Sequence, residues 1–545
     1  MAIFAMGWQK PDNVAGSSAP AIMVGLFVAT GGLLFGYDTG TINGILAMKA
    51  FKDHFSTGYV DGNGEPGIYP KESALIVAML SAGTAIGALL SAPLGDQYGR
   101  RRSLIGAIGI FVIGAILQVC AYNIGLLVAG RTVAGVGVGI VSVLVPLYQS
   151  EMAPKWIRGT LVCTYQLSIT MGLLAAAVVN ILTYQLKSAA AYRVPIGLQL
   201  TWACVLALGL TVLPETPRYL IKRGDKNAAA LSLSRLRRLD ITHPALVEEL
   251  AEIEANHQYE MALGPDSYKD ILFGEPHLGR RTFTGCCLQM LQQLTGVNFI
   301  MYYGTTFFNN AGVGNPFKIS LIMQIINTAS TIPGLFVVES WGRRRLLMVG
   351  AIGMAICQLL IAAYATANGS NNVTIQNKVR AKSMSISTAS NWLLNFGIAY
   401  GTPYMQTNSA AGHESSIDLG SKVFFVWGAF CIVAVGFVWC MVYETSKISL
   451  EQIDEMYERV DHAWHSRRFE PSWSFQQMRD FGFSESGIPP TQQQHQQQPQ
   501  VELQQSQSRT SNASTSQTDT GGSNTTSTSQ DDKLVASLGN IDLSY

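Results

Sequence analysis

The chain carries a series of apolar runs, most of them about 20 residues long, separated by short polar segments. A helix of about 20 apolar residues crosses the roughly 30 Å hydrocarbon core of a bilayer. Only 13% of the residues are charged, whereas soluble globular proteins average about 25%. The runs therefore predict an all-α, polytopic membrane protein with about eleven spans. We place the spans at about residues 21–46, 73–94, 103–122, 124–148, 160–184, 195–213, 282–307, 317–338, 346–365, 383–404 and 422–443.

Two short loops carry the same Gly-Arg-Arg pattern at corresponding places between spans. Gly95–Arg102 joins the second and third spans, and Glu339–Arg345 joins the eighth and ninth. Because Lys and Arg next to span ends favour the cytosolic side, we predict that both loops, the N-terminus and the hydrophilic insert between the sixth and seventh spans are cytosolic. A general preference for Arg in cytosolic loops explains the charge but not the shared pattern, which indicates two related halves.

Changes in composition divide the chain into six predicted segments. Residues 225–239 and 244–260 have helical periodicity, so the hydrophilic insert is predicted to form a small helical subdomain. The end of the chain is rich in Gln, Ser and Thr and is too polar to fold. The segments are a cytosolic N-terminus (1–20), a six-helix half (21–213), the cytosolic insert (214–281), a second half with five recognisable spans (282–443), a cytosolic tail with a short helix (444–490) and a disordered tail (491–545).

Two charged residues lie within the predicted spans. Asp38 lies in Gly36–Gly40 of the first span, and Arg131 lies near the start of the fourth. A charge at the bilayer centre costs at least about 2.5–3.5 kcal/mol, so each residue must pair or face water. We predict that they are partners. Either Asp38 carries a proton, or the pair is static and only orients the helices.

Uncharged amide side chains recur in the spans of both halves. An amide donates and accepts hydrogen bonds and so matches the hydroxyl groups of an uncharged sugar. The alternative is hydrogen bonding between helices, worth about 0.6 kcal/mol on average. Asn391 and Asn395 share a helix face, and a break at Gly296 would bring Gln292 and Asn298 together. The amides in this set are Gln166, Gln292, Gln293, Asn298, Asn327, Asn391 and Asn395.

Several other classes of function are not indicated. The net charge of +1 gives no reason to expect nucleic-acid binding. The sequence shows no P-loop, nucleophile elbow or metal-binding cluster, so we expect neither an enzyme nor a cofactor. All eight cysteines lie in apolar runs, where a cysteine acts as a small hydrophobic residue.

The motifs together resemble those of the sugar porter branch of the major facilitator superfamily, most closely those of fungal hexose transporters. Each motif alone is weak, but their order and their places at the span ends are specific, and they cover roughly residues 20–460. The resemblance implies two six-helix halves in the plasma membrane that carry a monosaccharide, glucose or another hexose, by alternating access. The matching motifs are Gly36–Gly40, Gly95–Arg102, Gly130–Gly139, Pro146–Glu151, Pro214–Leu220, Gln292–Asn298 and Glu339–Arg345.

The resemblance also implies roles for individual residues. Phe35 would line the site, and Asp38 and Arg131 correspond to the proton-coupling pair of the symporting members. The amides that would contact sugar are Gln166, Gln292, Gln293, Asn298, Asn327 and Asn391. Some members without coupling also keep an acid at this position, so symport and facilitated diffusion both stay open. Cytosolic latches between helices would be formed by Asp96, Arg100, Arg101, Glu151, Arg158, Glu215, Arg218, Glu339, Arg343 and Arg344.

The sequence departs from the family pattern in two places. The usual Pro-Glu-Thr-Lys-Gly after the last span is replaced by Tyr443–Lys447, which predicts a weakened latch. The tenth span is also missing, because Ala365 is followed by the polar Thr366–Asn377 and then by Lys378–Lys382, which resembles the cytosolic turn after that span. Either the last two spans invert, or the fold keeps its frame with a gap at the tenth helix. We expect the gap.

Two alternatives to a working transporter stay open. The long tail after the last span suits a glucose sensor or receptor on a transporter scaffold, in which cytosolic partners bind the tail. The missing span suits a transport-defective variant. In each case the lipid bilayer and a small-molecule sugar are expected partners, and protons join them if the chain is a symporter.

Overall fold

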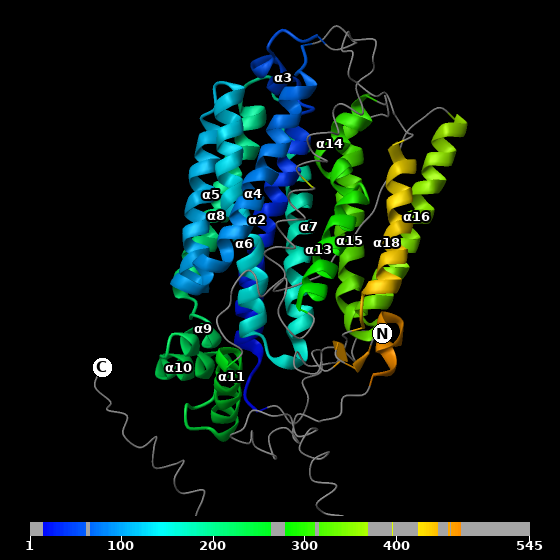
Figure 1. Cartoon of the computed structure of the whole chain (residues 1–545). Helices are drawn as coiled ribbons and strands as arrows, with labels where there is room; N and C mark the ends of the chain where they lie inside the picture. Colours follow the sequence, from blue (N-terminus) through cyan, green and yellow to red (C-terminus); the bar gives the residue numbers. More distant parts are fainter. Residues whose placement is uncertain are drawn as a thin grey trace, which may run out of the picture. The chain divides into compact units, whose positions relative to one another are not determined.

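The computed structural model describes residues 15–60, 66–262, 278–310, 315–368, 395, 423–444, 456–457, 459–460 and 462–469. Within these residues the regular structure is helical, and the long helices stand side by side in two groups (Figure 1). The chain order separates the groups, since α2 to α8 form the first half and α13 to α18 the second. The architecture is the all-α fold that the apolar runs predict.

The helices of the first half coincide with the predicted spans. Among the described helices, six are long and apolar enough to cross a membrane, and all six belong to this half. A short helix, α3 (Lys49–Phe55), follows the first of them. The six are α2 (Ala19–Ile45), α4 (Pro70–Tyr98), α5 (Arg100–Val119), α6 (Ile124–Met152), α7 (Arg158–Thr183) and α8 (Ala190–Val212).

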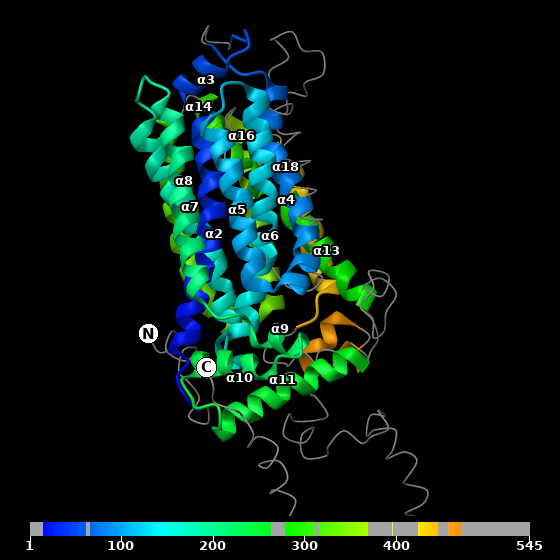
Figure 2. The ribbon, with the colours of Figure 1, turned by 90° about the vertical axis from the view of Figure 1, so that its left-hand side faces the viewer.

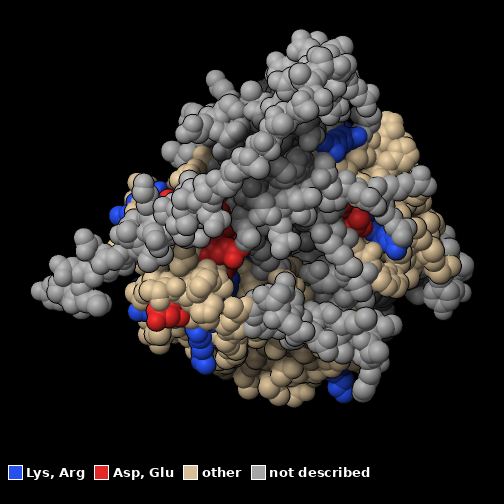
Figure 3. Space-filling model, turned by 90° about the horizontal axis from the view of Figure 1, so that it is seen from below, with Lys and Arg blue, Asp and Glu red and all other residues tan. Residues whose placement is uncertain are grey.

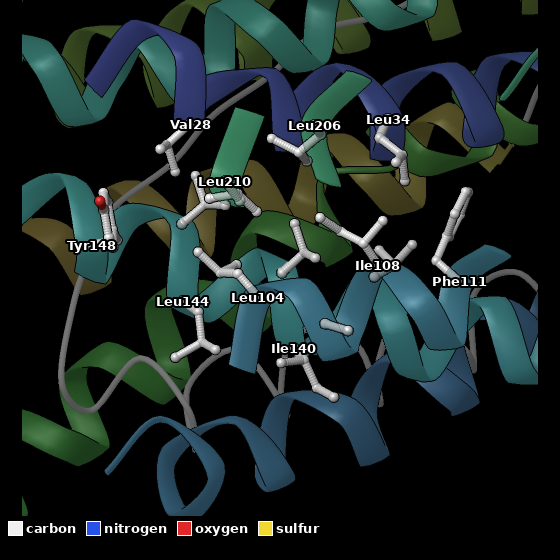
Figure 4. Packing of buried hydrophobic residues seen from close by; sticks show 14 of the residues in the cluster. Val28, Leu34, Leu104, Ile108, Phe111, Ile140, Leu144, Tyr148, Leu206 and Leu210 are labelled. Carbon is white, nitrogen blue, oxygen red and sulfur yellow. The ribbon is translucent and has the colours of Figure 1, made fainter. Parts of the chain in front are cut away.

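Glycines allow α6 to approach its neighbours closely. A Cβ at Gly135 would lie 2.3 Å from the Leu80 carbonyl oxygen of α4, and one at Gly137 would lie 2.6 Å from the Ala107 carbonyl oxygen of α5. Residues of α2, α5, α6 and α8 then bury a common apolar core, in which Leu34 and Phe111 are labelled in Figure 4. The glycines of the fourth predicted span therefore serve packing, as expected of small residues between membrane helices.

The described part of the second half contains three long helices and a broken one. The helices are α13 (Leu278–Leu294), α14 (Val297–Asn310), α15 (Pro316–Trp341), α16 (Arg343–Asn368) and α18 (Val423–Met441). The seventh predicted span is divided into α13 and α14, and α16 packs along α18 (Figure 1). The predicted span at 383–404 lies outside the described residues except for Asn395, and so does the region of the missing tenth span.

The described part of the insert forms three helices at one end of the bundle (Figure 2), which we call the cytosolic end. They are α9 (Pro217–Lys222), α10 (Lys226–Arg237) and α11 (Pro244–Ala262), and α10 and α11 match the two segments with helical periodicity. The described surface at this end carries both acidic and basic side chains (Figure 3). The start of the tail also packs here, since Met456 and Ala463 contact Tyr443 at the end of the last span.

Candidate functional site

Asp38 and Arg131 form a buried ion pair in the first half. Their side chains, on α2 and α6, are 2% and 1% exposed. Nη1 of Arg131 donates to both carboxylate oxygens of Asp38, at 3.2 and 3.3 Å. Nε of Arg131 donates to the carbonyl oxygen of Ile76 on α4 at 3.0 Å, while Nη2 has no hydrogen-bond partner within the described part of the chain. The structure therefore joins the two charges that the sequence predicts as partners.

The break between α13 and α14 depends on Gly296. Its φ is 79°, in the left-handed region that glycine adopts without strain. A Cβ at this position would lie 2.6 Å from Cγ of Trp427 on α18, so the glycine also makes room for that ring. The helix break that the sequence argument places at this glycine is present.

The break gathers amide side chains from different helices. Nδ2 of Asn298 donates to Oε1 of Gln293 and to Oδ1 of Asn395 at 2.8 Å. The sequence predicts that Gln292 meets Asn298, whereas the described contact of Asn298 is with Gln293. Asn395 completes the group; its side chain is not among the predicted sugar ligands, and Asn391, which is, lies outside the described residues.

Further amides lie on α15 and α16. Nδ2 of Asn327 donates to Oε1 of Gln324 at 3.2 Å, and Nε2 of Gln358 donates to the Thr295 carbonyl oxygen at 2.7 Å. Gln324 and Gln358 are buried and are missing from the predicted set, although each is an amide inside an apolar run. That signal applies to every intramembrane glutamine and could have found both.

Gln166 and Phe35 lie in the first half. Both are half-buried, Gln166 on α7 and Phe35 on α2. Phe35 packs against Ala88 and Val143. The described contacts thus bring Gln293 and Asn298 together in the second half, and Asn327 pairs separately on α15. The place of Gln166 and Phe35 in the sugar site stays a prediction.

At least four hydrogen bonds between described residues join the two halves, and these four lie in the middle of the bundle or toward the end opposite the insert. The Tyr184 ring also stacks on Phe317, with ring centroids 4.5 Å apart. The halves are therefore in contact on the side predicted to be external. The bonds run from the Thr305 N–H to Asn43 (3.0 Å), from Asn315 to Tyr184 (3.0 Å), from Thr328 to the Thr170 carbonyl (3.1 Å) and from Asn395 to Ser81 (3.2 Å).

At the cytosolic end, the first Arg-rich loop is held by acidic side chains. Arg100 contacts Glu151 at 3.1 Å and Asp96 at 3.1 Å. The carboxylate of Glu215 accepts from the backbone N–H groups of Arg100 and Arg101, each at 3.1 Å. Burial raises the pKa of the Glu215 carboxyl, whereas the N–H groups that it accepts from lower it. These contacts join five of the residues predicted to form cytosolic latches.

The second Arg-rich loop repeats this geometry. Gly99 and Gly342 have φ values of 93° and 84°, and a Cβ at either would lie 2.6 Å from a carboxylate oxygen, of Glu215 and Glu444 respectively. Oε2 of Glu444 accepts from the Arg344 N–H at 3.2 Å. The altered motif after the last span keeps this glutamate, and its carboxylate makes the contact that Glu215 makes in the first half. The weakening of the latch stays a prediction.

The remaining predicted latch residues are less fully described. Arg158 and Arg218 are half-buried at the cytosolic end, and Nε of Arg158 has no hydrogen-bond partner among the residues that the structure describes. The side chains of Glu339 and Arg343 lie outside the described part. Latch contacts between the two halves thus stay a prediction.

Comparison with known proteins agrees with this architecture. The family model described as "Sugar (and other) transporter" matches residues 24–376 and 374–457. The "Probable glucose transporter rco-3" of Neurospora crassa is 86% identical over 594 aligned positions that cover all of both chains. The "High glucose sensor RGT2" of Saccharomyces cerevisiae is 39% identical over 82% of this chain and 62% of its own length.

A solved structure shows the same fold. The proton:xylose symporter XylE, bound to 6-bromo-6-deoxy-D-glucose, superposes with a TM-score of 0.66 at 24% identity, covering 81% of this chain and all of that one. At this level of identity the similarity establishes the arrangement of helices. It is the fold of the major facilitator superfamily.

The comparisons also reveal a shortening of this chain. The alignment with the Neurospora relative has 594 positions and includes all 545 residues here, so at least 49 positions have no residue in this chain. The two matches to the family model meet at residues 374–376, inside the polar segment where the tenth span is missing by prediction.

Proposed function

We propose that this chain, which belongs to the sugar transporter family, binds a hexose, with glucose the favoured substrate. With a tenth span in place, this fold carries the sugar across the plasma membrane by alternating access. Membership makes it a multi-pass membrane protein of a transporter family rather than an enzyme. The identity of the sugar and its coupling to protons are the finer parts of the proposal.

The observation that carries the proposal is the amide cluster at the Gly296 break. Gln293 and Asn298 lie inside the bundle on α13 and α14, and Asn395 ties them to the first half. Amides can donate to and accept from the hydroxyls of a neutral sugar, and the cluster offers no charge to attract an ionic substrate. An uncharged cluster of hydrogen-bonding side chains, linked to both halves, suits a neutral substrate that both halves bind and release.

Proton coupling is the finer claim. The Asp38–Arg131 pair supports it, because a buried carboxylate with one cationic partner can exchange a proton when that partner moves. The neighbour with the same fold is named a proton:xylose symporter. We propose that Asp38 couples sugar to protons when the tenth span is in place.

Sugar binding tests the proposal directly. The purified chain in lipid nanodiscs is expected to bind labelled D-glucose, which unlabelled D-glucose displaces and L-glucose does not. Gluconate, a carboxylate of similar size, is the control for charge. Absence of specific D-glucose binding, or displacement by gluconate as strong as that by D-glucose, would contradict the assignment.

A glucose sensor is the second candidate. The 39% identity to a protein named a high glucose sensor favours it, as does the long tail beyond the last span. A sensor needs sugar binding but not transport. Removing residues 471–545 is expected to leave glucose uptake unchanged in a transporter, and to abolish glucose-dependent signalling without changing glucose binding in a sensor.

A further inference from the structure

We infer that Asn395 is a positioning residue that holds Asn298 for sugar binding and links it to the first half through Ser81. The inference rests on the proposed function, because it takes Asn298 to be a sugar ligand. It adds a role for two residues, on α4 and at position 395, that the predicted site does not contain.

The amide of Asn395 is fully engaged. Oδ1 accepts from Nδ2 of Asn298 at 2.8 Å, and Nδ2 donates to the hydroxyls of Tyr302 at 2.9 Å and Ser81 at 3.2 Å. Asn395 and Ser81 are 0% exposed, and Tyr302 is 1% exposed. With its oxygen and both N–H groups committed, the amide cannot flip without losing bonds. It therefore fixes the orientation of the Asn298 side chain.

Ser81 brings the first half into this network. It lies on α4, five residues after Ile76, whose carbonyl oxygen accepts from Arg131 at 3.0 Å. Five residues of helix correspond to about 7.5 Å along the axis. One rigid helix therefore touches both the amide network and the arginine of the buried ion pair. A sugar that reorients Asn298 would disturb the hydrogen bond between Asn395 and Ser81, and so change the contacts of α4.

Two other buried hydroxyl groups on α4 form hydrogen bonds within their own helix and not with the amide network. Ser91 donates to the Ala88 carbonyl oxygen at 2.6 Å, and Thr84 donates to the Leu80 carbonyl oxygen at 2.7 Å, so both bond within their own helix. Ser91 is fully buried like Ser81. It is the matched control, because Ser91→Ala removes the same hydroxyl from the same helix without touching the amide network.

A double-mutant cycle on D-glucose affinity, measured in the full-length chain in nanodiscs, tests the inference. Asn395→Ala is expected to weaken binding about 5-fold or more, because it removes one of the two amide oxygens that accept from Asn298, and only Gln293 remains to orient it. Ser81→Ala is expected to weaken binding about 3-fold, the usual size of one hydrogen bond between membrane helices. In the Asn395→Ala background, Ser81→Ala should have no further effect. Ser81→Thr should restore wild-type affinity, and Ser91→Ala should not change it.

Losses that multiply in the double mutant would overturn the inference, and so would an equal effect of Ser81→Ala and Ser91→Ala. If Asn395→Ala does not fold, Asn395→Ser replaces it in the same cycle. If the unmodified chain binds no hexose, the proposed function fails together with this inference. If it binds hexose and the losses multiply, only the positioning role fails.

Discussion

At the scale of single residues, the buried Asp38 carboxylate depends on one cationic side chain. Arg131 supplies that charge at 3.2 Å and is itself held by the Ile76 carbonyl of α4. This pairing was predictable, because opposite charges within the first and fourth apolar runs must pair or face water. The roles of Asn395 and Ser81 were not predictable in the same way, because a neutral amide or hydroxyl in a span can bond to its own helix or to any neighbour.

The substitution Asp38→Asn separates coupling from sugar recognition. Without a titrating carboxyl, accumulation of sugar against its gradient should be lost, while exchange of internal for external sugar should partly persist. The measurement is uptake and counterflow in proteoliposomes with an imposed proton gradient, made both on the chain as it stands and with a tenth span restored. Asp53→Asn, on the exposed face of α3, is the control. Wild-type uptake that ignores external pH and uncouplers would leave a facilitator instead of a symporter.

The substitution Gln293→Ala tests the amide cluster. Gln293 is 7% exposed and accepts from Asn298, and loss of a buried hydrogen-bonding partner costs about 1–3 kcal/mol. Sugar affinity should therefore fall by about 5- to 150-fold, as measured by binding of labelled D-glucose. The control is Gln258→Ala, an exposed glutamine on α11 of the insert. Unchanged affinity in folded protein would remove Gln293 from the site.

At the scale of helices, the sequence predicts where a helix lies along the chain better than it predicts a break within a helix. The described spans coincide with the apolar runs, because length and apolarity suffice to identify a membrane helix. The sequence alone does not decide whether Gly296 divides the seventh span, since a glycine in a span also serves close packing, as Gly135 does on α6. At Gly296 the glycine serves both a helix break and close packing against Trp427. The packing contact depends on the folded structure and cannot be read from the sequence.

Gly296→Ala should therefore disturb both the helix break and the site. A non-glycine residue in the left-handed region costs about 1–2 kcal/mol, and the new Cβ would lie 2.6 Å from the Trp427 ring. We expect a lower melting temperature and weaker sugar binding. The control is Gly353→Ala on α16, where an added Cβ meets no atom within 4 Å. A Gly296→Ala protein that melts and binds sugar like the wild type would show that the break does not depend on glycine.

At the scale of the whole molecule, two halves with matching loops meet toward the external side. The Gly99–Glu215 and Gly342–Glu444 contacts have the same geometry, which supports the internal repeat seen in the Gly-Arg-Arg loops. Glu444 also fixes the direction of α18, because its contact with the Arg344 N–H places the end of this helix at the cytosolic start of α16. Of the two outcomes considered for the missing span, this contact agrees with a frame that keeps a gap and disagrees with inversion of α18.

A gap of one helix should prevent a full transport cycle. The residues after α16, which ends at Asn368, are polar up to the basic turn at Lys378, and a span needs about 20 apolar residues. The alignment with the Neurospora relative lacks at least 49 positions in this chain, enough for a helix and its loops. The second half would therefore have one helix fewer than the first half, and one side of the sugar site would stay open.

Inserting the relative's additional segment at residues 374–376 tests this expectation. The restored chain should support growth on glucose in a host that lacks its own hexose transporters, and the chain as it stands should not, because lipid or water would enter the open side of the site. The amounts of both proteins at the cell surface must be equal, as measured through the same epitope. Equal growth at equal surface amounts would mean that the chain transports sugar without the additional segment, and other residues would then have to close this side of the site.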